Sequence, residues 1–61
     1  MGLKSSEQIK VVLAESNPMI LSAMSEKFSS DDRISLISTV TTAEDFLSTV
    51  LRVKVDLGIV C

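Results

Sequence analysis

The sequence predicts an α/β fold in which three parallel strands alternate with two helices, in the order βαβαβ. Apolar runs rich in Val and Ile occupy residues 9–14, 34–40 and 55–61, which is typical of strands. Between these runs lie two stretches with apolar residues at helical spacing, each preceded by residues that cap helices. Because each helical stretch is long enough for a right-handed crossover between strands, we expect a parallel sheet.

The first strand and the first helix have the clearest local signals. Residues 9–14 are almost continuously apolar, which favours a strand buried on both faces. Asn17 is a good N-cap, and Pro18 fits the first helical position, where its missing N–H costs nothing. The expected apolar stripe of this helix is Ile20, Ala23, Met24, Lys27 with its aliphatic stem, and Phe28, and the expected polar side is Ser22, Ser25, Glu26 and Ser29.

The second half of the chain repeats this alternation. Residues 29–33 form a polar turn, and residues 34–40 alternate only partly, which suits an edge strand. Thr41 and Glu44 match a capping box, and residues 52–54 place cations near the end of the helix. A final strand is expected from Val55 to Cys61, with Asp56 near its start and solvated. The apolar stripe predicted for the second helix is Ala43, Phe46, Leu47, Val50 and Leu51.

Length, composition and charge exclude several classes of function. The chain has 61 residues, so it is one domain at most, with a polar tail expected over residues 1–8. Its six basic residues are scattered and its net charge is −2, so we expect no direct binding of nucleic acid. No apolar run is long enough to span a membrane, and the single cysteine favours a reducing cytoplasm. No glycine-rich turn follows the first strand, which excludes the dinucleotide fingerprint and the P-loop.

Three residues are expected at the carboxyl ends of the strands, where open parallel sheets bind ligands. Glu15 and Ser16 follow the first strand, and Cys61 ends the third. The plainer interpretation, which we favour for both Glu15 and Ser16, is that they are polar residues of a strand-to-helix turn. A catalytic thiol at Cys61 would need a base, and the chain contains no histidine, so we expect no enzyme.

Residues 9–61 resemble the first half of a response-regulator receiver domain of two-component signalling. The resemblance rests on VVLAESNP at residues 11–18 and VDLGIVC at residues 55–61, with helix caps and hydrophobic spacing that align without a gap between them. The closest pattern is that of receivers in transcriptional regulators with a helix-turn-helix. This family has a flavodoxin-like sheet of order 2-1-3-4-5, which implies order 2-1-3 here, with one helix on each face.

The resemblance implies a phosphorelay function with a degenerate site. In the family, an aspartate at the end of the third strand accepts a phosphoryl group from a histidine kinase, and an acidic pair holds Mg²⁺. Cys61 falls on the acceptor position, while Glu15 and Ser16 fall on the acidic pair. A thiol and a hydroxyl are poor substitutes for carboxylates toward Mg²⁺, so we expect no bound metal. The family's switch Ser/Thr and its lysine come from strands four and five, beyond residue 61. The expected function is therefore an atypical or inactivated receiver segment that acts through contacts with a histidine kinase or another signalling protein.

An alternative function is a self-associating half-domain or engineered assembly unit without signalling activity. In the order 2-1-3 the third strand lies on an open edge, and its apolar side chains favour pairing with a second chain. Two interpretations of Cys61 also stay open: a replaced phosphoacceptor, native or engineered, or a cysteine without a role.

Overall fold

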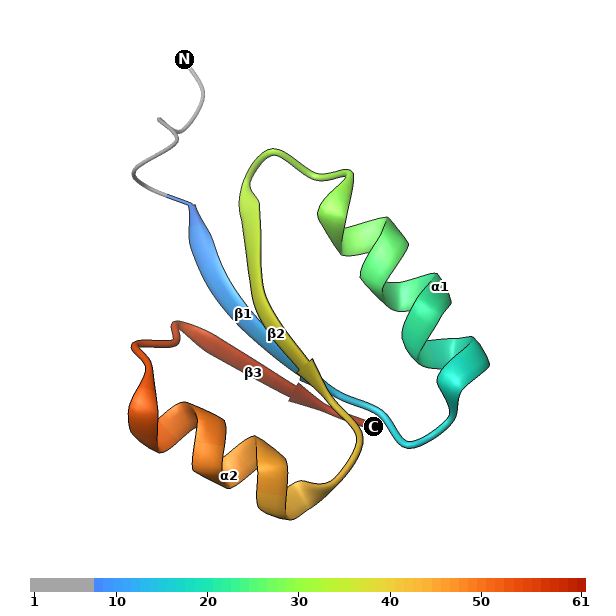
Figure 1. Ribbon diagram of the computed structural model, residues 1–61. Coiled ribbons are helices and arrows are strands. Elements are labelled where there is room, and N and C mark those ends of the chain that lie inside the picture. Colours follow the sequence, from blue (N-terminus) through green and yellow to red (C-terminus); the bar gives the residue numbers. More distant parts are fainter. Residues whose placement is uncertain (1–7) are drawn as a thin grey trace.

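The computed structural model describes residues 8–61, so the polar tail expected over residues 1–8 lies outside the described residues except for Gln8. The elements are β1 (Ile9–Ala14), α1 (Pro18–Ser29), β2 (Ile34–Val40), α2 (Ala43–Arg52) and β3 (Leu57–Val60). All pairings are parallel and the strand order is β2-β1-β3 (Figure 1). The predicted α/β class and the strand order 2-1-3 are confirmed. No helix of the described part is long and apolar enough to cross a bilayer.

The core lies along the central strand β1, as its sequence predicts. Val11, Val12, Leu13 and Ala14 are each at most 4% exposed. Their side chains alternate between the two faces of the sheet, so burial of all four requires a cover on each face. Figure 1 shows α1 and α2 on opposite sides of the sheet, and α1 contacts mainly β2 while α2 contacts mainly β1.

A close contact between α2 and β3 explains the glycine in the last strand. Gly58 pairs with Val12, and a Cβ atom at Gly58 would overlap Cζ and Cε1 of the Phe46 ring. The face of the sheet that carries Val12 and Gly58 is therefore the face that α2 covers. The missing side chain lets the aromatic ring lie directly on the strand backbone.

An irregularity in β2 separates the two halves of its pairing with β1. Val11 pairs with Leu36, but Val12 pairs with Ser38, so Ile37 is an extra residue in the edge strand. Such a bulge leaves one residue unpaired and increases the local twist. Ile37 is accordingly 39% exposed, and β2 presents an interrupted outer edge.

The buried face of α1 differs from the predicted stripe. The helix begins at Pro18 with Asn17 as N-cap, as predicted, because Asn17 Oδ1 accepts from Met19 N at 2.9 Å. The half-buried residues of the helix are Leu21, Met24, Ser25 and Phe28, whereas Ile20, Ala23 and Lys27 are exposed. The contact face is rotated from the predicted stripe toward Leu21 and Ser25, the latter expected on the polar side, and this face lies mostly over the edge strand β2.

The second helix also departs from its predicted cap and stripe. Its N-cap is Thr42 and not Thr41, because Thr42 Oγ1 accepts from Asp45 N at 3.1 Å, one residue later than the predicted capping box. Thr49 is the buried residue of α2, at 6% exposure, and Leu47 and Leu51 are 58% and 84% exposed. A sheet of three strands is too narrow to cover a full amphipathic stripe on this helix.

The last strand begins later than the sequence predicts. Regular pairing starts at Leu57 and not at Val55, although Asp56 N already donates to Lys10 O at 2.8 Å. Ile59 of this strand is half-buried and its other residues are exposed, with Leu57 at 50% and Val60 at 62%.

Candidate functional site

The three strands end together at one edge of the sheet. Glu15 N donates to Val40 O and Cys61 N donates to Ala14 O, each at 3.0 Å. The peptide unit between Ala14 and Glu15 is thus bonded to both neighbouring strand ends. The structure therefore places Glu15 and Cys61 at the same carboxyl edge, and Ser16 in the turn that follows β1.

Glu15 is turned toward its own loop. It is 8% exposed, and its Oε2 accepts from Asn17 N at 2.9 Å. Asn17 in turn accepts from Met19 N and Ile20 N at the start of α1. This relay holds the direction in which the chain leaves β1 and enters the helix. The geometry matches the turn role that the sequence favours for Glu15.

Ser16 and Cys61 are both exposed, and neither side chain forms a hydrogen bond within residues 8–61. The N-cap of α1 is Asn17, as predicted. Cys61 is a free thiol. Nothing in the surrounding geometry orients these two groups toward a common point.

The donor set at this edge does not fit the Mg²⁺ ion that the resemblance implies. Mg²⁺ demands octahedral oxygen coordination, usually with one or two carboxylates, and a thiol is a soft ligand. Glu15 is the one carboxylate of the three residues, and Asn17 N already occupies one of its oxygens. No group of three metal-binding side chains, and no pocket, occurs among residues 8–61.

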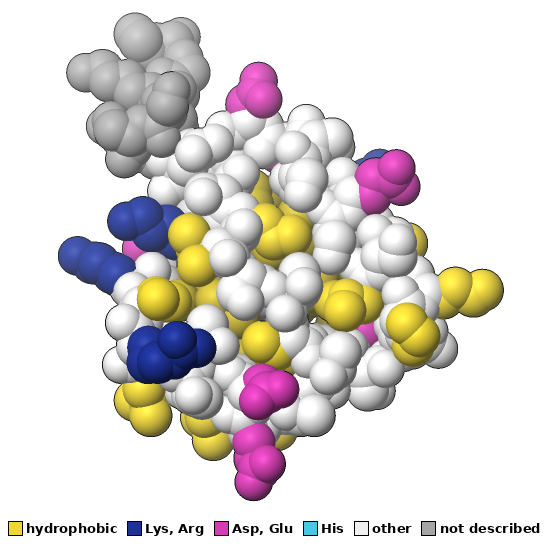
Figure 2. Space-filling model, in the orientation of Figure 1, with side chains coloured by type: hydrophobic (Ala, Val, Ile, Leu, Met, Phe, Trp, Pro, Cys, Tyr) yellow, Lys and Arg dark blue, Asp and Glu magenta, His cyan; other side chains and the backbone are white. Residues whose placement is uncertain are grey.

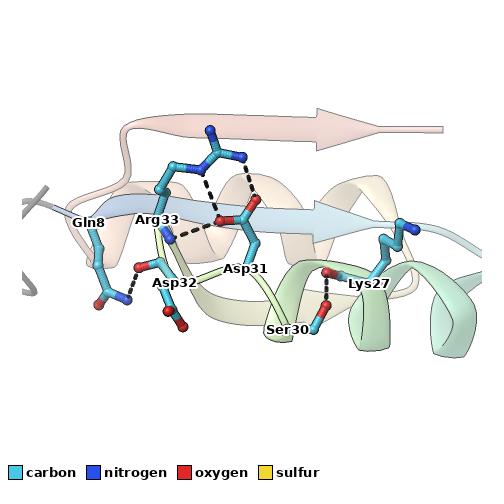
Figure 3. A network of polar contacts seen from close by, with 6 residues as sticks. All are labelled: Gln8, Lys27, Ser30, Asp31, Asp32 and Arg33. Carbon is cyan, nitrogen blue, oxygen red and sulfur yellow. Dashed lines mark hydrogen bonds and ion pairs between the residues drawn. The ribbon is translucent and has the colours of Figure 1, made fainter. Parts of the chain in front are cut away.

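The opposite, amino-terminal edge of the sheet carries polar contacts that the sequence did not predict. Asp31 Oδ1 accepts from Arg33 N at 2.9 Å, and Asp31 Oδ2 accepts from Arg33 Nη2 at 2.9 Å (Figure 3). The hydrogen bonds from Arg33 lower the pKa of Asp31 to about 2. Close by, Gln8 Nε2 donates to Asp32 O at 2.9 Å. The spacing Asp-x-Arg inside a predicted turn is the signal that could have indicated this pair.

Asp56 also belongs to this amino-terminal edge. It was expected to be merely solvated, but its Oδ2 accepts from Lys10 N at 2.9 Å, while its own N–H donates to Lys10 O. This reciprocal pair extends the ladder between β1 and β3 beyond the regular strand. No local pattern indicates it, because the two residues are far apart in the sequence.

Among the described residues, the amino edge thus has side-chain contacts within the turn before β2 and between β1 and β3. At the carboxyl edge, Glu15 and Asn17 bond within their own turn, and Ser16 and Cys61 are exposed. Comparison of the chain with protein-family models, with curated proteins and with solved structures finds no match.

Proposed function

We propose that this chain is an atypical receiver-like signalling segment whose phosphorylation site is inactive. The observation that carries the proposal is the pair of hydrogen bonds that brings the ends of the three strands together, so that Glu15, Ser16 and Cys61 share one edge. The parallel order β2-β1-β3 supports it, since this is the order of the first three receiver strands.

The chemistry of these residues supports inactivity. Cys61 offers a thiol where an acceptor carboxylate would be needed, and Ser16 offers no charge for a metal. The carboxylate of Glu15 is 8% exposed and bonded to its own turn. A segment of this kind would act by binding another protein, a histidine kinase or a different signalling protein, in a parent chain that regulates transcription.

The proposed compartment of this segment is a reducing cytoplasm. We propose that the segment has no enzymatic activity and contacts neither nucleic acid nor membrane. A single exposed thiol is compatible with that compartment. On the face seen in Figure 2 most of the basic side chains lie toward the left and one lies at the upper right, and they form no continuous stripe of the kind that tracks a phosphate backbone.

The proposal is tested by rebuilding the acidic site with the double variant S16D/C61D. We expect this variant to bind Mg²⁺ and, in its presence, beryllofluoride, because three carboxylates would then meet at the carboxyl edge. The unaltered chain should bind neither. Amide chemical-shift changes confined to the ends of β1 and β3 would report the binding.

A matched control is the double variant S22D/S48D, which adds two carboxylates at exposed positions within the helices, outside the turns of this edge, and should gain no Mg²⁺ binding. If S16D/C61D keeps the circular dichroism of the unaltered chain and still gains no Mg²⁺ binding, the edge is not a degenerate receiver site.

A second candidate function is a self-associating α/β unit, natural or engineered, without signalling. The observation that favours it is the outer edge of β3, where apolar side chains are exposed and no strand is paired among residues 8–61. Sedimentation as a monomer at all concentrations would exclude this second function and leave the first intact.

A further inference from the structure

The two outer strands of the sheet differ in their capacity to pair with another strand. β2 carries the bulge at Ile37, and bulges are a common means of preventing edge pairing. β3 is regular, and residues 57–61 contain no charged side chain and no proline. Only the β3 edge therefore lacks the features that keep strands apart.

The hydrogen bonds between β3 and β1 determine which backbone N–H and C=O groups of β3 point toward the open edge. Cys61 N donates to Ala14 O on β1. Because successive residues of a strand direct their N–H and C=O groups to opposite sides, Leu57 and Ile59 also face β1. The N–H and C=O groups of Gly58 and Val60 then point away from the sheet, toward the open edge.

We propose that a second copy of this chain pairs with β3 in antiparallel orientation about a two-fold axis at Ile59. This inference deepens the second candidate function and is independent of the first. An antiparallel pair needs outward-facing residues opposite each other, so Gly58 of one copy would exchange hydrogen bonds with Val60 of the other. This register pairs all of residues 57–61 and places no charged side chain in the interface. A shift by one residue in each copy, centred on Gly58, would instead place Asp56 opposite Val60.

The side chains are compatible with this register on both faces. On the α2 face, Val60 of the second copy would lie beside Gly58 and reach the exposed part of the Phe46 ring. On the other face, the two Ile59 side chains would meet at the axis, and Leu57 would lie opposite Cys61. Val60 and Leu57, which are 62% and 50% exposed, would both become covered.

The helices leave room for this arrangement. Neighbouring strands lie about 4.8 Å apart, so the two β1 strands of a dimer would be about 14 Å apart. Since α2 packs mainly against β1, the two α2 helices would be separated by more than the 8–10 Å of direct helix packing. A five-residue strand pair is smaller than the standard interface of about 1,600 Å², so the dimer should be dependent on concentration.

Cysteine cross-linking of the full 61-residue chain tests the register. Opposed residues that do not share hydrogen bonds have Cα atoms about 4.5 Å apart, within the range that a disulfide spans. With oxidised glutathione as the oxidant, I59C/C61S should form covalent dimers through its symmetric pair. L57C should also form them, through Cys61 of the other copy, whereas L57C/C61S and the unaltered chain should not.

A measurement without substitutions complements the cross-links. Under reducing conditions, the amide hydrogens of Gly58 and Val60 should exchange more slowly as the protein concentration rises, while those of exposed loop residues should not change. Sedimentation equilibrium should show a monomer–dimer transition over the same concentrations. A dimer in which I59C/C61S fails to cross-link would overturn the register and leave self-association in place. A chain that stays monomeric would overturn both.

Discussion

The two ends of the strands differ in how their polar groups are used. At the amino end, the Asp56 carboxylate accepts from Lys10 N and so joins β3 to β1, while the Asp31 carboxylate accepts from Arg33 within the turn between α1 and β2. At the carboxyl end, Glu15 serves its own turn, while Ser16 and Cys61 stay exposed without partners within residues 8–61.

This difference separates residues whose contacts stabilise the fold from residues that can be substituted at little cost in stability. A group that joins two elements loses its contact when it is replaced, and the protein loses stability. A surface group without a partner can be replaced at little cost. The contrast predicts a large effect of substitution at Asp56 and a small one at Ser16.

Among substitutions of carboxylates, the largest effect is expected for Asp56→Ala at the amino end. Removing the carboxylate leaves Lys10 N without its partner, and we expect the free energy of unfolding to fall by about 1 kcal/mol. Chemical denaturation at one fixed protein concentration would measure this, because any association makes stability depend on concentration.

Asp32→Ala is the matched control for that substitution. The Asp32 side chain is exposed and accepts no hydrogen bond among the described residues, so its loss should change stability by less than about 0.5 kcal/mol. Equal effects of the two substitutions would mean that Asp56 does not hold β3 to β1.

The contact of Asp56 also shows where sequence reasoning reached its limit. The strand over residues 9–14 and the Asn17-Pro18 helix start were predicted correctly, because continuous apolar character and capping are local signals. The partner of Asp56 is set by the register of β3 against β1, which no local pattern contains.

The exposed apolar residues of α2 illustrate a second limit of prediction from sequence. Leu47 and Leu51 share the spacing of a buried stripe with Phe46 and Val50, yet they are exposed, because the sheet under α2 is only three strands wide. In the candidate site, too, one part could be predicted from the sequence and another could not. Strand order places Glu15 and Cys61 at one edge, but the bond from Asn17 N to Glu15 depends on the conformation of the turn.

A smaller effect is expected from acid at Asp31. The hydrogen bonds from Arg33 lower its pKa from 3.8 to about 2 in the folded chain. The folded state therefore releases this proton more readily than the unfolded state, and the stabilisation is present above about pH 4 and lost as the pH falls toward 2. Carboxyl chemical shifts followed by NMR should give a midpoint near 2 for Asp31, and Arg33→Gln should return it toward 3.8. A midpoint near 3.8 in the unaltered chain would show that the pair does not form in solution.

The smallest effect is expected at the carboxyl end, for Ser16→Ala. Ser16 is exposed and its hydroxyl has no hydrogen-bond partner in residues 8–61. The free energy of unfolding should therefore change by less than about 0.5 kcal/mol. The neighbouring Asn17→Ala provides the contrast, since it removes the cap of α1 and should cost about 1 kcal/mol. Denaturation of both variants under identical conditions would compare them.

If Ser16→Ala were as destabilising as Asn17→Ala, the Ser16 hydroxyl would be a structural group of the turn. A neutral Ser16→Ala would instead mean that the S16D/C61D variant tests chemistry at this edge without a large cost in folding at position 16.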